Sequence, residues 1–108
     1  MYKGDRYHLD KMLEDIAFII EHMNGVTQDA LEEDPILCDS MMFRLVQISE
    51  QSGALSDALK AMNPDIPWND ITGLRNRIVH DYGNVNLGIV YETLSNDIPK
   101  LKEQLQGL

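Results

Sequence analysis

Residues 9–23 read LDKMLEDIAFIIEHM, and this stretch spaces its apolar side chains three or four residues apart. The repeated positions are Leu9, Met12, Leu13, Ile16, Ala17, Ile20 and Met23. This spacing matches the period of an α-helix and differs from the alternation of a half-buried strand. Gly25 is the expected stop signal. The stretch therefore predicts an amphipathic helix that packs against other helices.

The chain continues as further helices separated by short turn signals. Thr27 is a candidate N-cap for a short helix that ends near Asp34. Asp34-Pro35 is a second start, with Asp as the cap and Pro at the first helical position. Gly53 ends or bends the helix that follows. One face of this predicted helix contains Leu37, Met41, Leu45, Ile48 and Ser52.

The second half of the chain has the same organisation. A short segment over residues 55–62 runs into the turn signal Asn63-Pro64. Pro67-Trp68 opens a helix that Gly83-Asn84 should stop, and a last helix over residues 87–105 should kink at Pro99. No useful length of sequence alternates with a period of two. The prediction is an all-α fold, an up-and-down bundle of four to five helices in a single domain over residues 1–108.

The composition limits the class of protein. Apolar residues make up 44% of the 108 residues, which is enough for a core, although a domain this small gains stability from dimerisation. No stretch approaches the length of a membrane span, and the first residues lack the apolar segment of a secretory signal. Cys38 is the only cysteine, and the three histidines are scattered, so neither a disulfide nor a metal site is expected. We expect a cytoplasmic protein without a cofactor.

The formal net charge of −9 argues against non-specific binding to nucleic acid, which requires Lys and Arg to neutralise phosphates. The acidic residues include a block formed by Asp29, Glu32, Glu33 and Asp34. A protein of this charge that cuts RNA would need a local basic cleft, or a partner that supplies positive charge.

The stretch that carries chemistry is GLRNRIVHDYG, residues 73–83. On a helical wheel, Arg75 falls within about 60° of the apolar side chains of its helix. These side chains belong to Trp68, Ile71, Ile78, Val79 and Tyr82. Because an unpartnered buried guanidinium is costly, we expect Arg75 to face a cleft or a subunit interface and not a closed core.

His80 lies about 140° around the same helix from Arg75, and one turn beyond Asn76. A histidine titrates near neutral pH and can move a proton to or from a ribose hydroxyl or a leaving oxygen. An arginine stays charged and offers paired donors to a phosphate. The pair therefore suits phosphodiester chemistry. Many helices carry Arg and His at such spacing by chance, so on spacing alone a merely structural role is the default.

The same stretch resembles the HepT family of HEPN-domain proteins. Their motif is Arg, a polar residue, three variable residues, His, one variable residue and Tyr, and Arg75 to Tyr82 match it completely. The lead-in from Asp65 to Asn76, the following helix over residues 85–98 and, less specifically, residues 9–25 also look similar. The resemblance covers nearly the whole chain and implies a HEPN-type helical bundle.

The resemblance implies a metal-independent endoribonuclease toxin of a type VII HepT/MntA toxin–antitoxin pair. Two subunits would form a homodimer in which both motif copies line one cleft. Arg75 would bind phosphate and stabilise charge, His80 would transfer protons, and Asn76 would support His80. An MntA-type nucleotidyltransferase antitoxin would inactivate the toxin by attaching AMP to Tyr82, where added bulk and negative charge would exclude an RNA phosphate.

Other assignments stay open. Arg77 is a candidate for RNA binding, although a solvated position is the simpler interpretation. Arg44 either points into the same cleft or forms a salt bridge at its rim, and Met41 and Met42 are candidates for a dimer face. Trp68 is expected to pack in the bundle and to set the start of its helix. The alternatives to the toxin are a non-catalytic helical subunit that partners a nucleotidyltransferase, and a helical scaffold whose motif has lost its activity.

Overall fold

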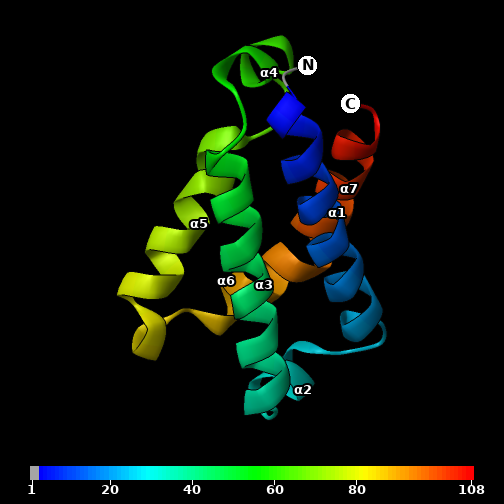
Figure 1. Cartoon of the computed structure of the whole chain (residues 1–108). Helices are drawn as coiled ribbons and strands as arrows, with labels where there is room; N and C mark the ends of the chain where they lie inside the picture. The colour runs from blue at the N-terminus through cyan, green and yellow to red at the C-terminus, as the bar shows by residue number, and fades with distance from the viewer. Residues whose placement is uncertain (1–2) are drawn as a thin grey trace.

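The computed structural model describes residues 3–108, and every regular element in that range is helical. This range contains seven α-helices and two short helical turns of other types (Figure 1). The helices are α1 (Lys3–Met23), α2 (Gln28–Glu32), α3 (Pro35–Gly53), α4 (Asp57–Met62), α5 (Trp68–His80), α6 (Leu87–Glu92) and α7 (Ile98–Gln106). The two turns are a 3-10 turn, η1 (Tyr82–Asn84), and a π-turn, η2 (Thr93–Asp97).

The long helices form an up-and-down bundle, as the sequence predicts. Helix α3 lies between α1 and α5 and packs on both. Segments α6, η2 and α7 follow one another without a break and form one long, irregular helical rod, the fourth long element of the bundle after α1, α3 and α5. This rod packs against α1 and crosses behind the other helices in Figure 1. The short helices α2 and α4 connect the long ones at opposite ends of the bundle. The described part of the chain contains no helix long and apolar enough to cross a membrane.

The predicted helix starts are confirmed by their hydrogen bonds. The Thr27 hydroxyl accepts the N–H of Ala30 at 3.1 Å and caps α2. The Asp34 carboxylate accepts the N–H of Leu37 at 3.0 Å and caps α3, with Pro35 in the first turn. Such caps replace partners that the first turn of a helix lacks within the helix itself.

The expected disturbance at Pro99 takes the form of a π-turn. Pro99 cannot donate a backbone hydrogen bond, and its ring crowds the preceding turn. The residues just before it, Thr93–Asp97, widen so that the N–H of Ile98 reaches the carbonyl of Thr93, five residues back. The rod therefore continues past the proline as α7 instead of stopping there.

The core confirms most of the predicted apolar faces. Helix α1 differs from the prediction in three positions: Ile19 is fully buried, whereas Ile20 is half-buried and Ala17 is exposed. Met41 and Met42 are also buried within the subunit, so their assignment to a dimer face is wrong. The most deeply buried large side chains are Leu9, Met12, Ile16, Ile19, Leu31, Met41, Leu45, Ile48, Leu94, Ile98 and Leu105.

Candidate active site

Helix α5, which carries the motif, is held in place by apolar contacts at both of its ends. Trp68 and Ile71 are buried near its start, and Ile78 is buried near its end. The indole Nε1 of Trp68 donates to the carbonyl of Asn63 at 3.0 Å, which fixes the loop that leads into the helix. This confirms the structural role predicted for Trp68.

Helix α5 ends at His80, three residues before the predicted stop at Gly83. Asp81 leaves the helical conformation, with φ −116° and ψ 23°, and η1 follows it directly. His80 is thus the last residue of the helix, and the motif tyrosine, Tyr82, begins the turn. The side chain of Tyr82 lies outside the part of the chain that the structure describes.

Arg75 lines an open cleft between α3 and α5, in agreement with the helical-wheel prediction. Its Nε lies 2.6 Å from Oε1 of Glu50 on α3, and its Nη1 donates to Oδ1 of Asn76 at 3.4 Å. About half of each partner in the ion pair is accessible, 46% for Arg75 and 52% for Glu50. The cleft has a volume of about 420 Å³ and is lined by Ser49, Glu50, Gly53, Ala54, Thr72, Arg75 and Asn76.

A buried hydroxyl ties the two walls of this cleft together. Ser49 on α3 is only 3% exposed. Its Oγ accepts the backbone N–H of Arg75 at 3.2 Å and donates to the carbonyl of Thr72 at 2.8 Å. The backbone that carries Arg75 is therefore held against α3 by a satisfied polar contact, which resists sliding of one helix along the other.

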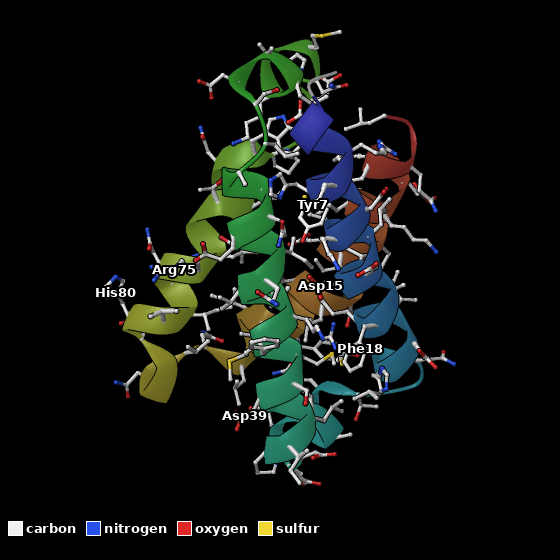
Figure 2. All side chains as sticks on the ribbon, viewed as in Figure 1. Tyr7, Asp15, Phe18, Asp39, Arg75 and His80 are labelled. Carbon is white, nitrogen blue, oxygen red and sulfur yellow. The ribbon has the colours of Figure 1, made fainter. Side chains whose placement is uncertain are left out.

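His80 is exposed on the same helix, further along toward its end (Figure 2). Among the described side chains, no hydrogen bond or ion pair joins His80 to Arg75 or to Asn76. Asn76 contacts Arg75 instead of His80. A single chain therefore presents the guanidinium and the imidazole on one helix but does not join them into a single bonded group.

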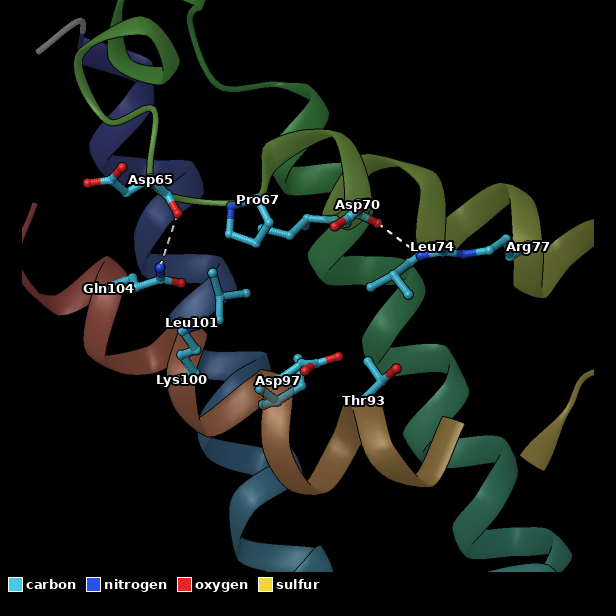
Figure 3. Close-up of a pocket in the computed structure, with 12 residues that line it drawn as sticks. Asp65, Pro67, Asp70, Leu74, Arg77, Thr93, Asp97, Lys100, Leu101 and Gln104 are labelled. Carbon is cyan, nitrogen blue, oxygen red and sulfur yellow. Dashed lines mark hydrogen bonds between the residues drawn. The ribbon is translucent and has the colours of Figure 1, made fainter. Parts of the chain in front are cut away.

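Arg77 lies on a different surface. Its Nη2 donates to the carbonyl of Asp70 at 3.1 Å, and its side chain borders a groove between α5 and the rod formed by η2 and α7 (Figure 3). Asp65, Asp70 and Asp97 line this groove of about 280 Å³, together with Lys100. Because these three acidic residues outnumber Arg77 and Lys100, the groove carries no net positive charge to bind a nucleic-acid phosphate.

Arg44 forms a salt bridge, but with α1 and not at the rim of the cleft that contains Arg75. Its Nη1 lies 2.9 Å from Oδ1 of Asp15 on α1, and its guanidinium stacks 3.8 Å from the ring centre of Phe18. It does not line the cleft that contains Arg75. Within residues 3–108, no three His, Cys, Asp or Glu side chains gather closely enough to hold a metal ion.

Comparison with known proteins gives one family and several relatives. The family model described as ribonuclease HepT-like matches residues 12–108. A protein of Caldanaerobacter subterraneus subsp. tengcongensis, named as a candidate RNase, is 30% identical over 98% of this chain and 95% of its own length. A protein of Thermococcus cleftensis, named as a candidate ribonuclease HepT, is 33% identical over 95% of this chain and 96% of its own length.

A third relative is longer. The Methanocaldococcus jannaschii protein named as a gamma-glutamylcyclotransferase and candidate RNase is 30% identical over 97% of this chain, which spans 47% of that protein. No solved structure matches the chain.

Proposed function

The chain belongs to the family of HepT-like ribonucleases, and on this premise we propose that it is a toxin that cleaves RNA with Arg75 and His80. The observation that carries the proposal is the placement of Arg75. Its guanidinium lines an open cleft with 46% of the side chain accessible, and the exposed imidazole of His80 lies on the same helix. The arginine, asparagine and histidine of the motif, Arg75, Asn76 and His80, are thus presented to solvent and not used to build the core.

The chemistry follows from the two side chains. RNA carries its own nucleophile, the ribose 2′-hydroxyl, next to each phosphate. In the proposed reaction this oxygen bonds to phosphorus, the bond from phosphorus to the 5′-oxygen breaks, and a cyclic phosphate and a 5′-hydroxyl result. A neutral His80 takes the proton from the 2′-hydroxyl, or a protonated His80 gives one to the leaving oxygen. Arg75 stabilises the negative charge that builds on the phosphate oxygens.

We further propose that two subunits assemble the complete site. His80 and Arg75 lie about 140° apart around α5, so a second copy would supply the imidazole or guanidinium that one copy leaves at a distance. Three large apolar side chains support such a contact. Tyr7 on α1 is 58% exposed, Phe43 on α3 is 57% exposed, and Val79 on α5 is 48% exposed. Phe43 shares the outer stripe of α3 with Glu50, and Val79 lies one turn beyond Arg75.

We propose that the antitoxin inhibits the nuclease by modifying Tyr82. A nucleotidyltransferase antitoxin would attach AMP to its hydroxyl and release pyrophosphate from ATP. Tyr82 follows the last residue of α5 by two positions, so the new phosphate would lie at the motif end of that helix. Its negative charge would repel RNA. Intact mass measured with and without the co-expressed partner tests this step: no AMP-sized gain in the co-expressed protein would contradict it.

The test of the nuclease uses Arg75→Ala and His80→Ala, incubated with RNA in the presence of a chelator. We expect each variant to lose activity by about a hundredfold or more, as proton-transfer and charge-stabilising groups usually contribute that much. Arg77→Ala and His22→Ala are matched controls, because both remove an exposed side chain of the same type away from the cleft. Equal cleavage by all variants, or none by unmodified wild type, would refute the proposal.

The second candidate is a non-catalytic helical subunit that partners a nucleotidyltransferase. The net charge of −9 favours it, because an acidic surface weakens any RNA contact outside the cleft. Both candidates bind the same partner, so only the nuclease assay separates them.

A further inference from the structure

Glu50 is the nearest charged neighbour of Arg75, and neither the motif nor its spacing points to it. It comes from α3, twenty-five residues earlier in the chain, and its Oε1 lies 2.6 Å from Nε of Arg75. We propose that Glu50 is a positioning residue for RNA cleavage, which turns the guanidinium of Arg75 so that its terminal amino groups face the substrate phosphate. This inference rests on the proposed function.

The geometry of the pair carries the inference. A guanidinium has five N–H donors, and Nε supplies only one of them. Glu50 engages that one, and Asn76 accepts from Nη1 at 3.4 Å, a long contact that a stronger acceptor can replace. The terminal edge of the guanidinium, which can donate two parallel hydrogen bonds, thus remains available for two oxygens of a phosphate.

The rest of the cleft supports a positioning role. Ser49, the neighbour of Glu50, holds the backbone at Arg75 through two hydrogen bonds. Adjacent residues of α3 therefore constrain the same arginine, one at its backbone and the other at its side chain. An exposed arginine otherwise samples many rotamers, and a guanidinium fixed before substrate arrives needs less ordering in the transition state.

If the ion pair of Glu50 and Arg75 served only to stabilise the fold, its removal would change the stability of the protein and not its catalytic rate. Both side chains are about half exposed, and a surface ion pair of this kind contributes little to stability. The negative charge of Glu50 also repels RNA. If repulsion of RNA were the only effect of Glu50, its removal would tighten binding and leave the chemical step unchanged, whereas a positioning role requires the chemical step to slow.

The experiment compares Glu50→Ala and Glu50→Gln with wild type, by kcat and KM on one RNA substrate and by thermal unfolding. We expect Glu50→Ala to lower kcat by about tenfold, because misplaced catalytic groups lose rate steeply, while KM stays equal or falls. Glu50→Gln should recover most of kcat, since its amide oxygen still accepts from Nε. Glu103→Ala on α7 is the matched control for charge, with kcat unchanged.

A second readout follows the pair directly. In the NMR spectrum, the Nε–H signal of Arg75, assigned by its loss in Arg75→Lys, should shift in Glu50→Ala and not in Glu103→Ala. An active wild type with kcat of Glu50→Ala within twofold of its own would overturn the positioning role and leave the nuclease standing. An inactive wild type would instead refute the nuclease, and the inference with it.

Discussion

Cys38 shows how a single side chain acquires its chemistry from its surroundings. The thiol is buried near the start of α3, with 6% of the residue exposed. Burial, followed by the charges of Asp39, Glu32 and Asp34, raises the pKa of the Cys38 thiol above its ordinary value of 9.0. A neutral, buried thiol is a poor nucleophile.

We therefore expect Cys38 to react at least about tenfold more slowly with iodoacetamide in the folded protein than in denaturant at the same pH. The raised pKa of Cys38 should also make the free energy of unfolding depend on pH. Below the ordinary pKa the thiol is protonated in both states, and above it the unfolded chain loses its proton first, so stability falls as pH rises. The difference in unfolding free energy between wild type and Cys38→Ala, measured with denaturant, should thus change with pH only in alkaline solution. Fast alkylation of the native protein would contradict this assignment.

At the residue scale, the sequence identifies groups that belong to one local segment. Arg75, Asn76 and His80 lie on one helix, so their spacing can be compared with a known motif. Ser49 and Glu50 reach the same cleft from α3, and their approach depends on how two helices pack. No local pattern marks them, because Glu50 looks like any solvated glutamate on an exposed stripe.

At the scale of single helices, the start of a helix is predictable where the sequence has a capping residue or a proline suited to the first turn. Thr27, Asp34 and Pro35 mark helix starts in the sequence, and the structure uses all three. The end of α5 was less predictable, because Gly83 suggests a stop but the helix already ends at His80. The sequence predicts only a kink at Pro99. It does not tell how the helix adjusts to the missing backbone N–H of the proline, which in the structure is by the π-turn before it.

The capping residue of α3 offers a test at this scale. Asp34→Ala should lower the free energy of unfolding by about 1 kcal/mol, because the N–H of Leu37 loses its acceptor. Asp34→Asn retains a capping oxygen and should cost much less. Urea unfolding followed by circular dichroism measures both. An Asn variant as unstable as the Ala variant would assign the effect to charge and not to the cap.

For the molecule as a whole, the helix order and the up-and-down packing follow from apolar periodicity and short connections. The way in which chains assemble does not follow from these patterns, because the sequence does not distinguish a side chain exposed to solvent from one that contacts another protein chain. The face that carries Phe43, Glu50, Arg75 and Val79 combines apolar area with the candidate cleft. Because the net charge of the chain is −9, we propose that RNA contacts the protein locally, at this face that carries Arg75.

Assembly can be tested by charge placed on that face. Phe43→Asp should shift the proposed homodimer toward monomer in analytical ultracentrifugation and reduce RNA cleavage by about tenfold or more, since burial of a carboxylate at an interface is costly. Met62→Asp, a similar change at a side chain 78% exposed on α4, should alter neither property. A Phe43→Asp protein that remains dimeric and active would place the interface elsewhere.

The two ends of the described chain meet at one pole of the bundle, where Nη2 of Arg6 donates to the carbonyl of Leu108 at 3.3 Å (Figure 1). The last turn of α5 points to the opposite pole. A reporter domain, dye or surface tether attached at either end would therefore stand clear of His80. The same closeness suits circular permutation: a short Gly-Ser bridge joining the ends and a new opening at Gly25 would keep the bundle intact.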